Sequence, residues 1–124
     1  MGYDKNNIFA KILRGEIPSK KVYEDDAVFA FADIAPAAPV HVLVIPKGHF
    51  ISFDDFVEHA SPETVSNFFA TVKKIAVAQG VDKTGYRLIT NHGADAAQSV
   101  PHFHVHILGG TSMGGLLPGD TNQR

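Results

Sequence analysis

The sequence predicts an α+β domain: a five-stranded antiparallel sheet with one short N-terminal helix and one long helix. This prediction rests on short apolar segments joined mostly by short links, and on one long stretch with apolar residues at helical spacing. Short links favour antiparallel pairing, and we expect the helices to pack on one face of the sheet. Residues 40–45 are apolar on both faces, which is typical of a central strand. The expected strands are residues 20–24, 27–32, 40–45, 86–90 and 102–108.

The long helix has the clearest signals at its two ends. Ser61 is a favourable N-cap, Pro62 suits the first helical position, and Gly80 follows the last periodic residue. The helix should therefore span residues 62–79. Its expected buried stripe consists of Val65, Phe68, Phe69, Val72, Ile75 and Ala76.

Three other segments carry weaker signals. Residues 6–15 predict a short helix with Asn6 as its cap and Gly15 as its end. The acidic turn at residues 24–26 predicts a hairpin between the first two strands. Residues 50–60 are expected to be irregular, with at most one helical turn.

The length and composition bound the class of protein. The 124 residues suffice for a single domain, with a core at about residues 7–110 and a flexible tail at residues 111–124. A net charge of −2 without a basic block makes a nucleic acid an unexpected partner. Any bound anion must be held by local backbone amides and imidazoles.

Cysteine and long apolar runs are both absent from the sequence. The lack of cysteine excludes disulfides, thiolate metal sites and a cysteine nucleophile. The N-terminal residues lack the apolar core of a signal peptide, and no apolar run approaches the length of a membrane span. We therefore expect a cytoplasmic protein with no membrane partner.

Three histidines at alternate positions are the main functional signal. A strand alternates its faces, so His102, His104 and His106 should point to one side. The outer two would lie about 13 Å apart, which makes His104 the natural centre of a reaction. From spacing alone, a solvated strand face, a metal site and phosphate chemistry all remain open.

The loop at residues 91–101 is the second informative stretch. Its small residues allow a ligand close to the backbone, and successive N–H groups can form an anion nest. Ser99 adds a hydroxyl beside the histidines. A plain surface loop remains the alternative interpretation.

These residues together resemble the histidine triad (HIT) superfamily. The run from His102 to Leu108 is similar to its His-x-His-x-His-x-x signature, where x is hydrophobic. The Gln98-Ser99-Val100 segment, the pair Gly109-Gly110 and the run from Arg87 to Asn91 narrow the resemblance to the Hint branch, whose members resemble purine nucleoside phosphoramidases. Matching upstream segments are Ile8-Phe9 to Ile17-Pro18, Glu24-Asp25-Asp26, Phe31 to Pro36 and Val44 to His49.

The resemblance implies a nucleotide hydrolase that acts at the α-phosphorus of a purine nucleoside monophosphate ester or amide. The nucleophile would be His104, which forms a covalent nucleotidyl-histidine. His106 and Ser99 would contact the phosphoryl oxygens and the leaving group. His102 would orient His104, with His49 as its supporting partner. No cofactor and no metal is implied.

The resemblance also implies a nucleotide pocket and a homodimer. The phosphate would be held by Asn91 and by the loop at Gln98 and Ser99, and Asp33 would accept hydrogen bonds from the ribose hydroxyls. Subunits would pair through residues 62–79 and 86–91. The residues expected to sandwich the base are Ile8, Phe9, Phe31 and Ile34.

Several alternatives stay open at this point. The chain could be a dinucleoside polyphosphate hydrolase, or a nucleotide-binding or zinc-binding protein with vestigial activity. Phe9 and Phe31 could be core residues, and His41 is expected to be a hydrogen-bonded structural histidine. Ala32 stands where many Hint-like chains have histidine, and the tail lacks the tryptophan of animal members, so base and leaving group stay undetermined.

Overall fold

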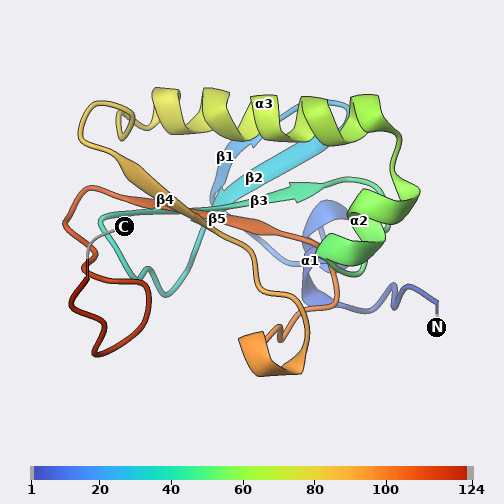
Figure 1. Ribbon diagram of the computed structural model, residues 1–124. Helices are drawn as coiled ribbons and strands as arrows, with labels where there is room; N and C mark the ends of the chain where they lie inside the picture. Colours follow the sequence, from blue (N-terminus) through green and yellow to red (C-terminus); the bar gives the residue numbers. More distant parts are fainter. Residues whose placement is uncertain (1, 123–124) are drawn as a thin grey trace.

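The computed structural model of this protein describes residues 2–122 and contains a five-stranded sheet in the order β1-β2-β3-β5-β4 (Figure 1). Every neighbouring pair is antiparallel, which confirms the predicted fold class. The strands are β1 (Lys21–Glu24), β2 (Val28–Ala32), β3 (Val40–Pro46), β4 (Tyr86–Ile89) and β5 (Val105–Gly109). The helices are α1 (Ile8–Leu13), α2 (Phe53–His59) and α3 (Pro62–Ala78), with a short 3-10 helix, η1 (Ala94–Ala96).

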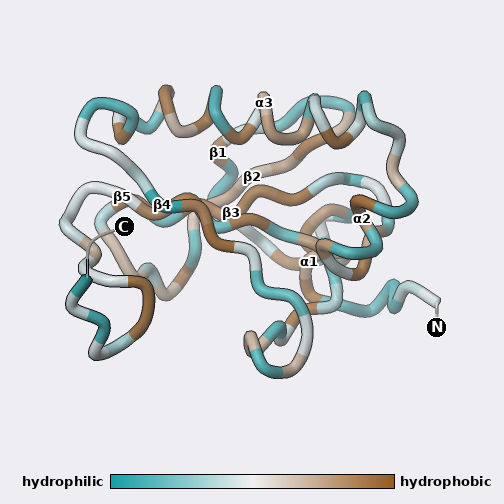
Figure 2. The backbone as a smooth tube through the Cα atoms, in the orientation of Figure 1, coloured by the Kyte–Doolittle hydropathy of each residue, from teal (hydrophilic) through white to brown (hydrophobic). Residues whose placement is uncertain are grey.

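The strands β2 and β3 carry apolar side chains on both faces, and both are largely hydrophobic in Figure 2. In β2, Val28 and Ala30 belong to one core, whereas Phe29 and Phe31 belong to another. Each apolar face of the sheet must be shielded from water by a packed layer. α3 accordingly lies over one face and α1 lies under the other (Figure 1). The expectation that the helices pack on one face is therefore wrong.

The larger core lies between the sheet and α3. This helix begins as predicted, because Ser61 accepts a hydrogen bond from the Thr64 N–H at 3.0 Å and Pro62 occupies the first turn. Phe69 is expected to be buried but is 37% exposed. It directly follows Phe68, so it points about 100° away from the buried stripe. The buried helix residues are Phe68, Thr71, Val72, Ile75 and Ala76.

The smaller core lies beneath α1. In it, Phe9 and Ile12 pack against aromatic and aliphatic side chains of β2 and β3. α1 is shorter than residues 6–15, and its cap is Asn7, not Asn6. The Asn7 side chain accepts a hydrogen bond from the Ala10 N–H at 2.9 Å, a bond for which Asn6 lies one residue too early.

Helix α2 replaces the irregular structure expected at residues 50–60. Ser52 accepts the Asp55 N–H at 3.3 Å, and the Asp55 carboxylate accepts the Ile51 N–H at 2.7 Å. This reciprocal cap starts the helix. Burial of Phe56 in the larger core then holds it in place.

The strand β5 begins at Val105, so the expected strand 102–108 is wrong at its start. The backbone groups before Val105 bond outside the ladder: the Phe103 N–H donates to the Phe50 carbonyl at 2.7 Å. The His104 carbonyl accepts the Thr90 hydroxyl at 2.8 Å. Two of the three alternating histidines therefore lie on a segment that is held by the Phe50 carbonyl and the Thr90 hydroxyl and not by strand pairing.

The C-terminal residues fold back as a loop beside β4 (Figure 1). The Arg87 guanidinium donates to the carbonyls of Gly114 and Gly115, at 2.9 and 3.2 Å. Among residues 2–122, no helix is both long and apolar enough to cross a membrane.

Candidate active site

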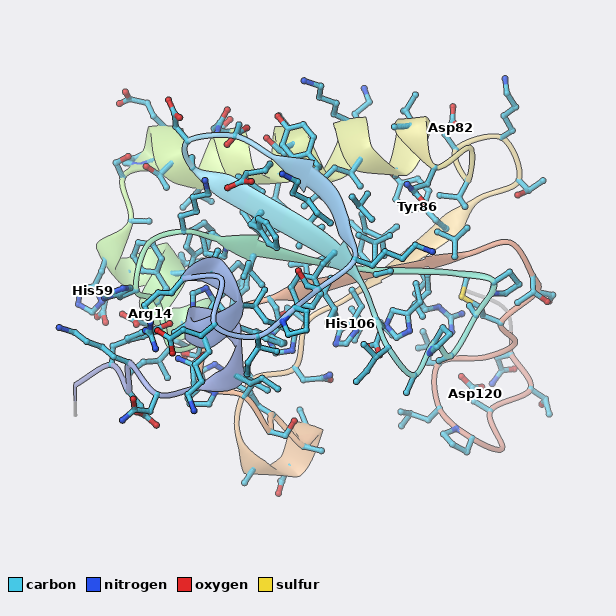
Figure 3. All side chains as sticks on the ribbon, turned by 180° about the vertical axis from the view of Figure 1, so that it is seen from behind. Arg14, His59, Asp82, Tyr86, His106 and Asp120 are labelled. Carbon is cyan, nitrogen blue, oxygen red and sulfur yellow. The ribbon has the colours of Figure 1, made fainter. Side chains whose placement is uncertain are left out.

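A cavity of about 390 Å³ opens on the α1 side of the sheet. Seen from behind, His106 lies near the middle of the molecule, between α1 and the C-terminal loop that carries Asp120 (Figure 3). The walls come from α1, the segment after β2, the loop at 91–101 and the start of β5. Every residue predicted to bind nucleotide lines this cavity: Ile8, Phe9, Phe31, Asp33, Ile34, Asn91, Gln98, Ser99, His104 and His106.

His104 has a defined proton position. Its Nδ1 lies 2.7 Å from the carbonyl oxygen of His102, and because a carbonyl only accepts, Nδ1 carries the proton. The other ring nitrogen, Nε2, therefore holds a lone pair. The edge-on ring of Phe9, at 4.9 Å between centroids, packs against the imidazole. A neutral imidazole with a free Nε2 is a nucleophile.

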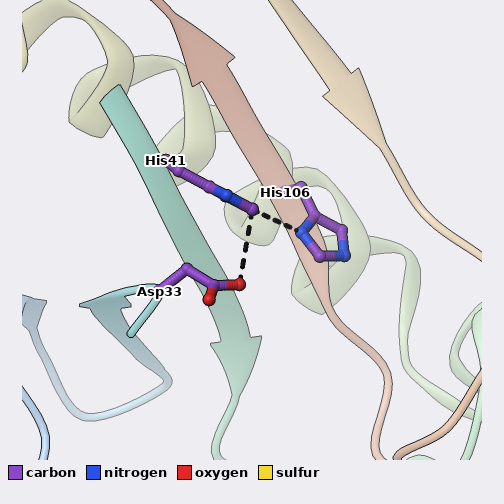
Figure 4. Close-up of side chains that lie close together, drawn as sticks. All are labelled: Asp33, His41 and His106. Carbon is purple, nitrogen blue, oxygen red and sulfur yellow. Dashed lines mark hydrogen bonds and ion pairs between the residues drawn. The ribbon is translucent and has the colours of Figure 1, made fainter. Parts of the chain in front are cut away.

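His106 has the opposite proton arrangement, which His41 imposes (Figure 4). The Ala37 N–H donates to His41 Nδ1 at 3.0 Å, so neutral His41 carries its proton on Nε2. That Nε2 lies 2.9 Å from His106 Nδ1, which must accept. His106 consequently carries its own proton on Nε2 and offers the cavity a donor.

All three alternating histidines are held neutral by burial. Burial lowers the pKa of His102 from 6.5 to about 4 and that of His106 to about 4. Burial also lowers the pKa of His104, against a hydrogen bond to the His102 backbone that raises it. The site at neutral pH thus contains uncharged imidazoles with assigned donors and acceptors.

Asp33, His41 and His106 lie close enough to suggest a metal site, since their ligand atoms lie within 4.8 Å of one another (Figure 4). A metal on His41 Nε2 would leave the proton on Nδ1, which then needs an acceptor. Nδ1 instead faces the Ala37 N–H, so with a metal on Nε2 the His41 Nδ1–H and the Ala37 N–H would point at each other with no acceptor between them. These three residues fit a shared proton better than they fit a metal ion.

Asp33 is also oriented by its own backbone. Its Oδ1 accepts the Ala35 N–H at 2.8 Å, while Oδ2 lies 3.5 Å from His41 Nε2. The carboxylate lines the cavity beside Ile34, whose side chain is 95% exposed at the cavity's edge. An acceptor at the edge of an apolar cavity suits a ligand with hydroxyl groups.

The loop at 91–101 is held by Gln98. Its amide nitrogen donates to the carbonyls of Ile51 at 2.7 Å and Val100 at 3.2 Å, and its oxygen accepts the Gly93 N–H at 3.1 Å. Ala97, just before it, has a left-handed backbone with φ 56°. These contacts present Ser99 at the cavity wall.

His102 and His49 lie outside the cavity lining given above. His102 is fully buried, and its Nε2 donates to the Pro46 carbonyl at 2.8 Å. His49 does not bond directly to His102; it stacks on the ring of Tyr3 at 4.3 Å. Tyr3 in turn reaches His102 Nδ1.

The sequence does not predict the roles of two residues at the site, His41 and Tyr3. His41 is confirmed as a hydrogen-bonded histidine, but its bond to His106 depends on strand register. Alternation places His41 on the α1 face with Leu43, which pairs with His106. Tyr3 precedes the first helix, and no local pattern indicates its contact with His102.

Comparison of the sequence with known proteins identifies the family of this chain. The sequence model of the HIT domain matches residues 14–113. The chain belongs to the HIT family. An uncharacterized HIT-like protein of Rickettsia prowazekii is 48% identical over 115 residues, which cover 93% of this chain and 96% of the relative. The purine nucleoside phosphoramidase of Escherichia coli K12 is 42% identical over 113 residues, 91% of this chain and 94% of that protein.

Solved HIT structures share the fold. A histidine triad protein from Clostridium difficile superposes with a TM-score of 0.84 at 46% identity, covering 92% of this chain and 98% of the other. A histidine triad nucleotide-binding protein from Candida albicans gives a TM-score of 0.79 at 31% identity, covering 95% of this chain and 87% of its own.

Proposed function

We propose that this HIT protein is a nucleotide hydrolase that cleaves the P–N bond of purine nucleoside 5'-phosphoramidates. The products are the nucleoside monophosphate and an amine. The observation that carries the proposal is the opposite protonation of two neighbouring imidazoles, 5.2 Å apart between ring centroids. His104 offers a lone pair to attack phosphorus, and His106 offers an N–H that can donate a hydrogen bond to the phosphoryl or leaving group.

In the first half-reaction, His104 Nε2 attacks the α-phosphorus. The Nε2–P bond forms and the P–N bond breaks, which leaves a covalent nucleotidyl-histidine. The positive charge that develops on the His104 ring is shared with the His102 carbonyl through Nδ1–H. The leaving nitrogen takes up one proton from a water molecule, while the His106 Nε2–H donates a hydrogen bond to the departing group and keeps its own proton.

In the second half-reaction, water attacks phosphorus and the Nε2–P bond breaks. The proton that this water loses replaces the one that the amine took up, so the cycle consumes one water and no net proton. His41 keeps the His106 ring in the same orientation and tautomer throughout, because the His41 Nε2–H remains bonded to His106 Nδ1. Asn91 and the backbone around Ser99 stabilise the phosphoryl oxygens in this scheme.

The cavity supports a nucleotide as the substrate. Its volume of about 390 Å³ lies within the usual range of small-molecule sites. Apolar residues form the part expected to hold the base: Ile8, Phe9, Phe31 and Ile34. Asp33 supplies the acceptor for the ribose hydroxyls. Phe9 and Phe31 serve the smaller core at the same time, so the core and pocket interpretations do not compete.

The relatives favour the P–N bond as the target. The Escherichia coli relative, which aligns over nine-tenths of this chain, is named purine nucleoside phosphoramidase. We extend that activity to this chain because the cavity brings together the residues that the chemistry requires. The proposal includes a homodimer formed through α3 and the edge strand β4.

The test is hydrolysis of adenosine 5'-phosphoramidate by the wild type and by His104→Ala, with a chelator present. We expect turnover by the wild type and a loss of more than about 1,000-fold in the variant, because the nucleophile is removed. AMP should still bind the variant, since the apolar pocket and Asp33 are unchanged. Binding is measured by calorimetry.

Equal activity in both proteins, or none in either, would contradict the proposal. His59→Ala is the control, because His59 lies on α2 and is 64% exposed, away from the cavity. Its turnover should equal that of the wild type.

A further inference from the structure

Tyr3 reaches the catalytic region from the segment before α1. Its hydroxyl lies 2.5 Å from His102 Nδ1, 99 residues along the chain. The opposite ring nitrogen of His102 donates to the Pro46 carbonyl, so Nδ1 has a lone pair and the Tyr3 O–H must donate. Burial raises the pKa of Tyr3, which keeps this hydroxyl protonated.

The contact is partly buried, and it is buried on the His102 side. His102 has no exposed surface, so a lost donor at Nδ1 would leave an unsatisfied nitrogen. The Tyr3 ring stacks on His49 with an interplanar angle of 4°, and it meets the His102 ring edge-on at 5.5 Å. His49 and Tyr3 therefore act as one unit against His102.

His102 passes this constraint to the nucleophile through its backbone. Its carbonyl accepts the His104 Nδ1–H at 2.7 Å, the bond that leaves His104 Nε2 with its lone pair. The segment from His102 to His104 lies before β5 begins, so strand pairing does not fix the carbonyl. The Phe103 N–H of the same peptide unit donates to the Phe50 carbonyl at 2.7 Å, and the two hydrogen bonds to the His102 ring hold the residue from its side chain.

We propose that Tyr3 is a positioning residue for the nucleophile: its O–H holds His102 in the Nε2–H form, and the His102 carbonyl thereby fixes His104 with Nε2 free. This inference rests on the proposed hydrolase function for its kinetic consequences. The geometry of the imidazoles can be observed without turnover.

The test is Tyr3→Phe, which keeps the ring stacked on His49 and removes only the hydroxyl. We expect kcat for adenosine 5'-phosphoramidate to fall about tenfold, with KM and the Kd for AMP unchanged within a factor of two. The acid limb of the pH profile should move to lower pH, because the hydrogen bond to the His102 carbonyl raises the pKa of His104 and a less well-held carbonyl weakens that bond. A purely structural role of Tyr3 would not move that limb.

Tyr23→Phe is the matched control. Tyr23 lies on β1 and donates to Asp25 at 2.7 Å, so it loses one tyrosine hydrogen bond away from the cavity. Its kcat and pH profile should equal those of the wild type. Tyr3→Phe should unfold at a lower temperature than Tyr23→Phe, because only Tyr3→Phe leaves a buried ring nitrogen without its donor.

The imidazole nitrogens give a readout that is independent of activity. In ¹⁵N spectra, the wild type should show protonated Nε2 on His102 and protonated Nδ1 on His104, and Tyr3→Phe should change the His102 signals. Unchanged His102 signals together with an unchanged kcat would overturn the positioning role. Changed signals in a protein without turnover would uphold it and would refute the hydrolase function instead.

Discussion

At the scale of single residues, the site works by fixing where protons sit. A carbonyl, which cannot donate, fixes the proton on His104; a backbone N–H, which cannot accept, fixes the one on His41. As a result the two imidazoles carry their protons on opposite nitrogens: His104 on Nδ1 and His106 on Nε2. Burial keeps both rings neutral, so the assignment holds at neutral pH.

This arrangement predicts how activity depends on pH. In the proposed mechanism His104 attacks only when neutral, and burial lowers its pKa below the ordinary 6.5. A lowered pKa means that His104 remains neutral at pH 6.5 and gains its proton only at lower pH. We therefore expect kcat/KM to stay constant from about pH 8 down to below pH 6.5. It should fall at still lower pH, where His104 becomes protonated.

The measurement is a pH–rate profile together with an NMR titration of the histidines. His59 is the internal reference, because its hydrogen bond to Asp55 raises its pKa above 6.5. His59 should titrate before His104 as the pH is lowered. An acid limb centred at or above pH 6.5, or the reverse order of titration, would contradict this prediction.

The sequence predicts those parts of the site whose residues lie close together along the chain, and it misses contacts between residues that are far apart along it. The histidine alternation and the loop residues near Ser99 are local signals, and the cavity brings them together with Asp33. The partnership of His41 with His106 requires strand register, and Tyr3 requires the path of the N-terminal segment. Neither depends on a local pattern.

At the scale of elements, the loop at 91–101 is the least regular wall of the cavity. Gln98 ties it to residue Ile51, just before α2, and closes it on Gly93. The left-handed Ala97 turns the chain so that Ser99 follows at the wall. The sequence predicts that Gln98 binds nucleotide directly; the structure adds a role in shaping the loop.

Gln98→Ala should therefore weaken substrate binding more than chemistry. Removing these hydrogen bonds frees the loop that we propose holds the phosphate, and we expect KM to rise about tenfold with kcat reduced less. Amide hydrogen exchange in residues 93–99 should accelerate as well. The control is Gln79→Ala at the end of α3, outside the cavity. Unchanged exchange in the Gln98 variant would refute the loop role.

Elements with strong local signals are predicted well and the others are not. The caps of α3 and the continuous apolar run of β3 determine those elements by themselves. Helix α2 is one of the missed features, although Ser52 and Asp55 form a cap that the sequence contains. The second helix layer follows from β2, whose consecutive Phe29, Ala30 and Phe31 already require two covered faces.

At the scale of the whole molecule, β4 forms one edge of the sheet, and its outer side pairs with no other strand among residues 2–122. It bonds to β5 alone on its inner side, and Leu88 is 45% exposed on the face that α3 covers. Phe69 and Val77 of α3 are also exposed, at 37% and 49%. An unpaired edge beside exposed apolar side chains favours pairing with a second copy.

The last prediction tests this homodimer. Sedimentation should give a mass near twice the 13.4 kDa of the chain, and Leu88→Lys should shift it to one chain by placing a charge in the interface. Val57→Lys is the control, because Val57 on α2 is 49% exposed and lies outside the β4 and α3 surface. It should remain dimeric. If the wild type sediments as a single chain, the exposed apolar residues of β4 and α3 need another explanation, and the active site must function within one chain.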